Sequence, residues 1–450
     1  MNEKFRQYLE EAIGHDNALV AFSAFDSPAS VSVRANPFKE GCRMQGRSVR
    51  WNPYGVMLDS RPSFTLDPLF HAGAYYVQDS SSMFVGHMFR RVLEHMTLPS
   101  SRPLRVLDLC AAPGGKTTDL CASLRERCGD DFLLVANEVM KARVGVLADN
   151  VALWGDPNVV VTSDDPRDFA QLAGYFDIIL ADVPCSGEGM FRKDENAREQ
   201  WSEDNVALCQ ARQRRIIADV WPSLCSEGVL IYSTCTFNRH ENDDNVYWIA
   251  ENLGADIVHE QIEGEGLIRT GTGYSLVPGL VEGEGQYCAV MRKTSGQETV
   301  SRRQPRTAAS KSPSLPSGLE SLFSVPMKFS SHGDMITAVP ETVAEETSML
   351  RRLLKVISAG CAVGTVKGKV LVPDADMALS IKLSGNAFPR AEVDRHTALS
   401  YLHRDAIVLP EAPDGYVLVC HEGLPLGFVK NLGKRCNSLH PQSRRIRMDI

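Results

Sequence analysis

Strands and helices that alternate along the middle of the chain constrain its fold most. Short apolar runs, each followed by a segment with helical spacing, recur through residues 104–252. We expect strands at 104–109, 132–137, 158–161, 176–181 and 229–233, and helices ending near 124 and spanning about 141–153, 166–173, 202–224 and 239–252. Because neighbouring parallel strands need helical crossovers, this pattern predicts an open, doubly wound, Rossmann-like α/β sheet. A late run at 286–291 is expected to be its last strand.

The 450 residues are too many for one ordinary domain, so we predict several parts. From the N-terminus these are a helix-bearing extension, the sheet domain, a linker, an intermediate region and a small β-rich module, at 1–100, 101–293, 294–318, 319–384 and 385–450. The linker is predicted from its Ser, Pro, Thr, Gln and Arg content and its lack of large apolar residues. The last module has short apolar runs between Gly, Pro and Asp turns.

The charge of the chain is unevenly distributed. A net charge of −8 does not by itself indicate a nucleic-acid binder. Residues 425–450, however, hold six basic side chains against one acidic, and residues 34–50 hold five against one. Such clusters suit phosphate contact, although a short charged run is also typical of a solvated surface.

The cysteines and apolar runs indicate the compartment. The 12 cysteines include no C-x-x-C pair, so we expect free thiols and no bound metal. There is no apolar signal stretch at the N-terminus and no run long enough to span a membrane. We therefore expect a cytoplasmic protein with no membrane partner. Separately, we expect it to act as a monomer.

A glycine turn follows the first strand of the sheet. The segment runs Asp108-Leu-Cys-Ala-Ala-Pro-Gly-Gly-Lys116 and leads into a helix. Glycines allow close approach of a ligand to the backbone, and a helix N-terminus offers free N–H groups. The spacing matches neither G-x-G-x-x-G nor a P-loop. Glu138, after the next strand, suits a ribose hydroxyl pair, although the glycines alone could simply turn the chain.

Two further segments place thiols after strands. Asp182-Val-Pro-Cys185-Ser-Gly-Glu-Gly189 follows one strand and Tyr232-Ser-Thr-Cys235-Thr236 follows the next. We expect Cys235 to lie at a helix N-terminus, which would lower its pKa and favour the thiolate. The alternative for a free cysteine is a small buried apolar residue.

Two thiols beside a nucleoside-type cofactor suit methylation of cytosine at carbon 5. A thiolate that adds to carbon 6 makes carbon 5 nucleophilic toward the methyl group of a sulfonium. Afterwards the proton on carbon 5 must leave and the thiol must be eliminated. A second thiol can assist that step.

Taken together in this order, the three motifs resemble those of the Sun-type (Nol/Nop/Sun) RNA cytosine-C5 methyltransferases. Within that family the chain is most similar to the bacterial RsmF type, which modifies small-subunit ribosomal RNA. The segment Tyr76-Val-Gln-Asp-Ser-Ser-Ser82 resembles a lead-in segment of the family. Residues 398–402 and 423–427 resemble parts of a C-terminal PUA-like RNA-binding module, and the first hundred residues would then be an RNA-recognition extension.

The resemblance implies S-adenosyl-L-methionine as cofactor and a role for each motif residue. The cofactor loop would be Cys110, Ala111, Ala112, Pro113, Gly114, Gly115 and Lys116. Glu138 would hold the ribose, Asp165 would lie beside the adenine, and Asp182 would lie between cofactor and cytosine. Cys235 would be the nucleophile, with Cys185 assisting product release.

Three alternatives stay open at this stage. A DNA cytosine-C5 methyltransferase would use Cys185 as its nucleophile. A transfer RNA methyltransferase would share the same motifs. A non-catalytic RNA-binding factor of ribosome assembly would need neither thiol. In any RNA enzyme of this kind the target base must leave its stack. Arg192 and Lys193 could then grip a flanking phosphate, or could be an ordinary surface pair.

Overall fold

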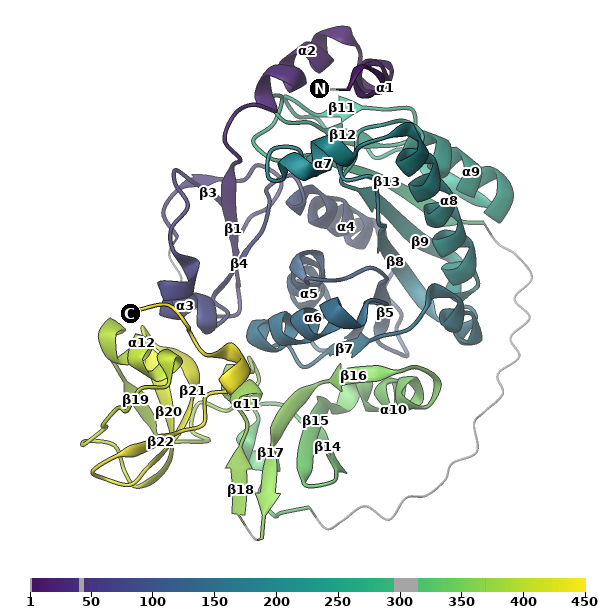
Figure 1. Cartoon of the computed structure of the whole chain (residues 1–450). Coiled ribbons are helices and arrows are strands. Elements are labelled where there is room, and N and C mark those ends of the chain that lie inside the picture. The colour runs from purple at the N-terminus through teal and green to yellow at the C-terminus, as the bar shows by residue number, and fades with distance from the viewer. Residues whose placement is uncertain (1, 40–43, 295–314, 369) are drawn as a thin grey trace.

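The computed structural model describes residues 2–39, 44–294, 315–368 and 370–450 (Figure 1). Most of the predicted linker, 294–318, lies outside the described residues, as does Arg43 of the N-terminal basic cluster. Among the described helices, none is long and apolar enough to cross a bilayer.

A ten-stranded sheet forms the centre of the molecule. Its strand order is β11-β12-β13-β9-β8-β5-β6-β7-β16, with β10 paired to β13. The five middle strands are parallel: β9 (Leu224–Thr234), β8 (Phe176–Asp182), β5 (Leu104–Asp108), β6 (Phe132–Asn137) and β7 (Val159–Thr162). The antiparallel strands are β10 (Ala255–Val258), β11 (Ile268–Arg269), β12 (Tyr274–Leu276), β13 (Gln286–Lys293) and β16 (Val356–Ala359). The predicted doubly wound, Rossmann-like sheet is confirmed.

Helices cover both faces of this sheet, which is why its middle strands are continuously apolar. In β6, Leu134 packs on one face, toward α4 (Met83–His95), α5 (Gly115–Cys128) and α6 (Lys141–Trp154). Its neighbours Leu133 and Val135 pack on the other, toward the 3₁₀ segment η2 (Pro166–Leu172), α8 (Glu203–Val220), α9 (Asp243–Leu253) and α10 (Ala344–Leu353). All six residues of β6 are buried, as expected for a strand covered on both sides.

Three predictions about this domain are wrong in detail. β13 is not the last strand, because β16 joins the sheet beyond β7 from the region predicted as intermediate. The segment predicted as helix over 166–173 is 3₁₀. The helix predicted from 239 begins only at Asp243. Side chains of Asn238 and Asn242 bond to nearby groups and hold the preceding residues as a loop.

The N-terminal extension forms two helices and a small sheet. Helices α1 (Glu3–Ile13) and α2 (His15–Ala24) precede a sheet in the order β2-β3-β1-β4. Its strands are β2 (Arg47–Ser48), β3 (Gly55–Leu58), β1 (Val31–Ala35) and β4 (Tyr75–Val77), and the 3₁₀ turn η1 (Phe64–Leu66) and helix α3 (Pro68–His71) lie between β3 and β4.

Two members of the basic cluster predicted at residues 34–50 are buried and not available at the surface. Arg34 is fully buried and donates to Gln78 and Thr118. Lys39 is also buried and donates to the carbonyl oxygens of Ala72 and Leu153, both at 2.6 Å. Burial lowers the pKa of Lys39 to about 7. These two side chains therefore join the extension to the sheet domain and cannot contact phosphate.

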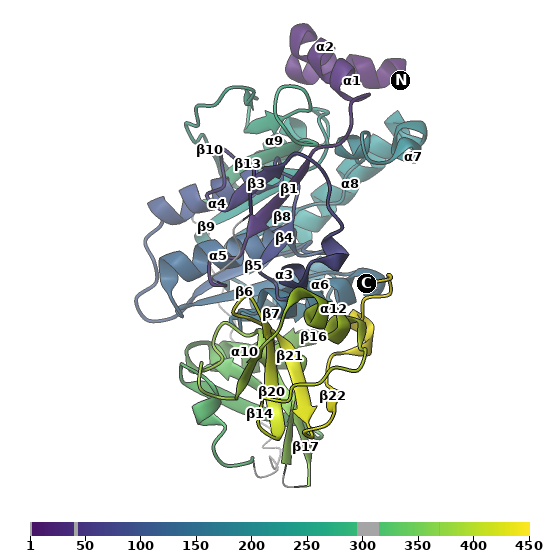
Figure 2. The ribbon, with the colours of Figure 1, turned by 90° about the vertical axis from the view of Figure 1, so that its left-hand side faces the viewer.

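Two four-stranded sheets follow the central one (Figure 2). The first contains β14 (Met327–His332), β15 (Met335–Pro340), β17 (Cys361–Lys367) and β18 (Val370–Pro373). The second contains β19 (Arg390–Glu392), β20 (Gly415–His421), β21 (Leu424–Asn431) and β22 (Cys436–Ser438). Helices α11 (Ala375–Leu379) and α12 (Arg395–His403) complete them, and α12 lies beside α3 of the extension in both views.

A substitution at Gly73 tests the close packing between the extension and α6. Its φ is +69°, and a Cβ there would lie 1.8 Å from the carbonyl oxygen of Leu153. We expect Gly73→Ala to lower the free energy of unfolding by about 3 kcal/mol or more, from backbone strain and collision together. Gly187→Ala is the matched control, because that residue is left-handed (φ +80°, ψ +27°) with nothing within 4 Å of a Cβ. It should cost only about 1–2 kcal/mol. Equal losses in urea unfolding would contradict the close contact.

Candidate active site

The residues predicted to carry chemistry meet at one edge of the central sheet. Asp108 ends β5, Glu138 follows β6, Asp182 ends β8 and Cys235 follows β9. These strands are parallel, so their carboxyl ends share an edge. Strand order reverses between β5 and β8, and that is where ligands of doubly wound sheets bind.

The glycine turn after β5 is held by neighbouring side chains. Gly114 has φ +111°, and α5 begins at the next residue. The carbonyl oxygen of Pro113 accepts from Asn150 at 2.8 Å and from the hydroxyl of Tyr76 at 3.2 Å. Arg143 donates to the carbonyl of Ala112. The loop is thereby fixed with the first turn of α5 beside the sheet edge.

Buried acidic groups surround this loop. Asp108 accepts from Thr117 at 2.7 Å through Oδ2, while its buried Oδ1 has no partner among the described residues. Burial raises the pKa of Asp108 to about 7. Glu138 is 4% exposed, and its carboxylate accepts from the backbone of Met140. Asp165 caps η2 by accepting from the backbone N–H of Arg167. An unpartnered acceptor and a glycine cradle suit a ligand that carries amino and hydroxyl groups.

Asp182 lies at the centre of the edge. Its Oδ2 is 2.9 Å from Nζ of Lys116, and its Oδ1 accepts from Ser233 at 2.7 Å and from Gln286 at 3.3 Å. Burial alone would disfavour the Lys116 ammonium, but Asp182 outweighs it and raises the pKa of Lys116. Lys116 also interacts electrostatically with Cys235. A permanent cation therefore lies near this thiol.

The two predicted thiols lie side by side. Sγ of Cys185 is 3.1 Å from Sγ of Cys235. Their hydrogen bond, together with burial, raises the pKa of the Cys185 thiol. The predicted helix N-terminus at Cys235 is wrong, because α9 begins eight residues later. Lys116 supplies the positive charge that the helix does not.

Two buried glutamates, which the sequence analysis missed, hold the loops that carry the thiols. Glu188 Oε2 accepts from the backbone N–H groups of Phe237 (2.7 Å) and Asn238 (3.1 Å). Its Oε1 accepts from the side chains of Trp201 and Asn238, both at 2.9 Å. Glu241 reaches back in the other direction and accepts from the backbone N–H of Ser186 at 3.0 Å. The loop after Cys185 and the loop after Cys235 are thus cross-linked reciprocally.

Close backbone packing joins the same two loops. The N–H of Gly189 donates to the carbonyl of Cys235 at 2.7 Å, and a Cβ on Gly189 would lie 2.7 Å from that oxygen. Only glycine fits there without a shift of the loops. In the sequence, the Glu188-Gly189 pair of the second motif was the feature that could have predicted these contacts between the two loops.

The carboxyl of Glu241 predicts a pH dependence of stability. Burial, then the charge of Glu188, raises its pKa from 4.5 to about 7. The folded state holds this proton more tightly than the unfolded state does. The contribution of Glu241 to the free energy of unfolding is therefore full below pH 4.5 and is lost as the pH rises through 7. The loss amounts to about 3 kcal/mol. Relative to wild type, Glu241→Gln should flatten the fall in unfolding free energy between pH 5 and 8; parallel profiles would contradict this.

Of the two basic residues for which a phosphate grip and a surface position were both left open, Arg192 is already engaged with protein groups. Its side chain is 8% exposed, lies 3.0 Å from Glu284, and donates to the carbonyl of Pro28. Lys193 is 3.6 Å from Asp79 and is 36% exposed. Arg192 therefore holds the N-terminal extension, so neither of the two alternatives, a phosphate grip or an ordinary surface residue, describes it. Among the described residues, no cluster of His, Cys, Asp and Glu suits a metal ion.

Three family models match the chain. That of the 16S rRNA methyltransferase RsmB/F covers residues 95–292, that of the N-terminal domain of 16S rRNA methyltransferase RsmF covers 1–80, and that of the methyltransferase RsmF PUA domain covers 388–446. The solved structure of NSun6 from Pyrococcus horikoshii with SFG has a TM-score of 0.53 at 19% identity, over 66% of this chain and 99% of that one. At this identity the likeness shows the fold alone.

Fold and family models together define a Rossmann-like methyltransferase with an N-terminal domain and a C-terminal PUA domain. Among curated relatives, the ribosomal RNA small subunit methyltransferase F of Enterobacter sp. (strain 638) is 29% identical over 98% of this chain and 95% of its own length. That of Shewanella sp. (strain W3-18-1) is 31% identical over 82% of this chain and 78% of its own length. The chain belongs to the RsmF family of methyltransferases, as its motifs predict.

Proposed function

We propose that this protein methylates carbon 5 of a cytosine in small-subunit ribosomal RNA, with Cys235 as the nucleophile and Cys185 assisting release. The observation that carries the proposal is the pair of thiols 3.1 Å apart at the sheet edge, beside Lys116 and the cofactor loop. A methyltransferase that acts on an intrinsically nucleophilic atom needs no such pair. Relatives named as ribosomal RNA methyltransferases support the substrate class.

The cofactor we propose is S-adenosyl-L-methionine. When bound, it supplies a methyl group on a sulfonium. Glu138 suits the ribose hydroxyls and Asp165 the adenine side, while the loop 110–116 would lie along the molecule. The unpartnered Oδ1 of Asp108 suits its amino group. A structural neighbour solved with SFG, an analogue of this cofactor, supports the assignment.

The residues of the chain would act in sequence. Cys235, as thiolate beside Lys116, forms a bond to carbon 6 of the cytosine, and the ring electrons move to carbon 5. Asp182, fixed by Ser233 and Lys116, is placed to hydrogen-bond the ring. After methylation, a base removes the proton on carbon 5 as the bond between carbon 6 and Sγ breaks. Cys185 donates to the departing sulfur and keeps it from rebinding.

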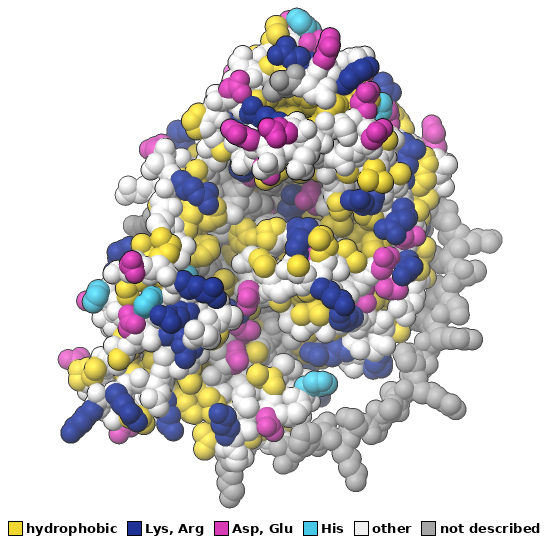
Figure 3. Space-filling model, in the orientation of Figure 1, with side chains coloured by type: hydrophobic (Ala, Val, Ile, Leu, Met, Phe, Trp, Pro, Cys, Tyr) yellow, Lys and Arg dark blue, Asp and Glu magenta, His cyan; other side chains and the backbone are white. Residues whose placement is uncertain are grey.

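Affinity for RNA would come mainly from the C-terminal domain. Lys and Arg side chains gather over it (lower left in Figure 3). Its exposed basic residues are Arg390, Arg395, Arg404, Lys430, Lys434, Arg435 and Arg447. Binding through phosphates should weaken as salt rises. We retain the predicted limits of the parts, at residues 100, 293, 318 and 384, as a proposal for the organisation of the chain.

The test is methyl transfer from labelled S-adenosyl-L-methionine to three substrates in parallel: small-subunit ribosomal RNA, assembled small subunits and total transfer RNA. We expect label in the ribosomal substrate, mapping to 5-methylcytosine. Label only in transfer RNA would overturn the substrate, and label on another base atom would overturn the chemistry.

A further inference from the structure

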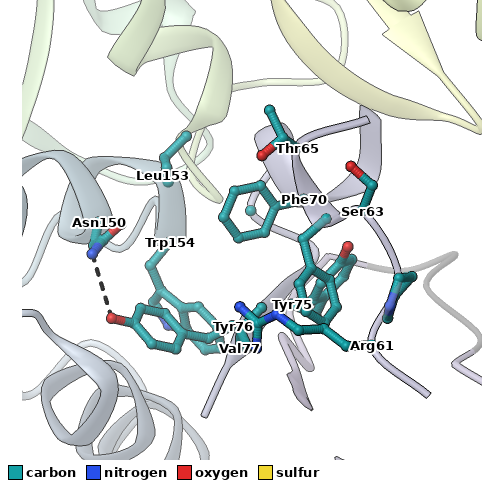
Figure 4. Close-up of a pocket in the computed structure, with 13 residues that line it drawn as sticks. Arg61, Ser63, Thr65, Phe70, Tyr75, Tyr76, Val77, Asn150, Leu153 and Trp154 are labelled. Carbon is teal, nitrogen blue, oxygen red and sulfur yellow. Dashed lines mark hydrogen bonds between the residues drawn. The ribbon is translucent and has the colours of Figure 1, made fainter. Parts of the chain in front are cut away.

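A cavity of about 420 Å³ lies outside the catalytic edge, between the N-terminal extension and α6. Its walls come from the segment around η1 and α3, from β4, and from the last turns of α6. Figure 4 shows the rings of Phe70, Tyr76 and Trp154 around one space, with the side chain of Arg61 reaching in among them. No step of the proposed mechanism uses these four side chains, although Tyr76 also holds the cofactor loop through Pro113.

The chemistry of the lining favours a flat, aromatic, anionic ligand. Phe70 and Tyr76 contribute partly exposed rings, and the buried rings of Phe64, Tyr75 and Trp154 also line the cavity. Among the described residues that line the cavity, none is acidic, and the exposed Arg61 lies over the ring of Phe64 at 5.4 Å. Aromatic faces stack on nucleobases, and arginine stacks on bases or pairs with phosphate.

Polar groups in the cavity can read the edge of a base. The amide nitrogen of Asn150 donates to Pro113 and to the hydroxyl of Tyr76 (Figure 4). Its Oδ1 and the hydroxyl of Ser63 have no hydrogen-bond partner among the described residues, although both residues line the cavity. An acceptor and a donor are therefore available there.

The cavity lies between the cofactor loop and the C-terminal domain. Tyr76 and Asn150 hold the carbonyl of Pro113, so the cavity shares a wall with the cofactor loop. On its other side, Asn150 and Leu153 also line a second cavity of about 250 Å³, which reaches His440 and Arg444 of the C-terminal domain. A strand that passes from the basic C-terminal domain to the catalytic edge would cross it.

We propose that this cavity binds one unstacked nucleotide of the RNA substrate, with its base between Phe70 and Tyr76 and its phosphate at Arg61. The proposal rests on the proposed RNA methyltransferase function and adds to it a binding site away from the methylated base. It also gives the extension a direct role in RNA recognition.

The test combines cross-linking with affinity on the full chain. Small-subunit ribosomal RNA carrying 4-thiouridine is irradiated with wild-type protein, and the cross-linked peptides are identified by mass spectrometry. We expect cross-links in the peptides that contain Phe70, Tyr75 and Tyr76. Cross-links confined to the catalytic loops and the C-terminal domain would overturn the proposal.

Two variants separate a nucleotide site from a structural role. Arg61→Ala should weaken binding of the same RNA about 5-fold at 0.1 M salt and lower the log–log salt slope by about 0.7. Phe70→Leu keeps apolar packing but removes the ring, and should weaken binding about 10-fold with no change of slope. Arg127→Ala, the same charge change at an exposed position on α5, is the control and should bind as wild type.

The outcomes distinguish this proposal from the proposed function. If Arg61→Ala and Phe70→Leu bind RNA within twofold of wild type, the cavity is not a nucleotide site, whatever the enzyme methylates. If they lose affinity as expected and 5-methylcytosine is absent from the product of wild type, the site stands and the proposed chemistry falls. Should Phe70→Leu fail to fold by circular dichroism, Arg61→Ala and the cross-link map still decide.

Discussion

Cys235→Ala is expected to lower methyl transfer by about 10⁴-fold or more, because it removes the group that would activate carbon 5. Without an adduct at carbon 6, the ring has no nucleophilic carbon to offer. Binding of S-adenosyl-L-methionine should change by less than twofold, since Cys235 lies outside the cofactor loop. Rates are to be measured under single-turnover conditions with labelled cofactor.

A thiol far from the site provides the control. Cys128 lies at the C-terminal end of α5, away from the carboxyl edge of the sheet. Cys128→Ala should methylate at the wild-type rate. If Cys235→Ala retained even a tenth of wild-type activity, Cys235 would not be the nucleophile and the alternative of Cys185 attack would gain support.

Glu188→Ala is expected to lower the free energy of unfolding by about 3–5 kcal/mol, because it leaves three buried N–H donors without an acceptor. Those donors belong to the loop after Cys235 and to Trp201. A shift of that loop by about 1 Å would also reduce catalysis by about 10²-fold. Chemical denaturation and single-turnover rates should therefore change together.

Two controls accompany this variant. Glu195→Ala, an exposed glutamate at the start of α7 (Glu195–Gln200), should stay within about 0.5 kcal/mol of wild type. Glu188→Gln keeps one acceptor oxygen and removes the charge beside Glu241. It should recover part of the stability and lower the pKa of Glu241, which shifts the pH dependence of unfolding to lower pH. A stable, fully active Glu188→Ala would show that the glutamate pair is dispensable.

Much of the fold and of the site was predictable from local pattern. Short continuous apolar runs such as β6, each followed by a helical segment, favour strands covered on both faces. The position of each motif after a strand then places its residues at one edge. Cys185 and Cys235 come together because β8 and β9 are adjacent and parallel. The sequence predicts that these strands are neighbours, because they belong to two consecutive strand-and-helix units.

What escaped prediction depends on contacts between distant segments. The pairing of β16 with β7 joins residues on opposite sides of the linker, and nothing local in 356–359 announces it. Arg34 and Lys39 look like surface charges in the sequence, yet both donate to groups of the sheet domain. Arg34 donates to Gly115 and Thr118, and Lys39 donates to the carbonyl oxygen of Leu153. Glu188 and Glu241 look like solvated acids, and only the facing loop makes them internal. Their burial depends on partners about 50 residues away.

The most direct test of the account is a search for a covalent protein–RNA adduct in Cys185→Ala. The variant is mixed with S-adenosyl-L-methionine and with small-subunit ribosomal RNA or total transfer RNA, then denatured and digested for mass spectrometry. We predict an adduct of methylated cytidine on the peptide containing Cys235, with little release of product, because elimination lacks the assisting thiol. No adduct in Cys185→Ala, or an adduct formed by Cys235→Ala through Cys185, would contradict the assignment of the two thiols.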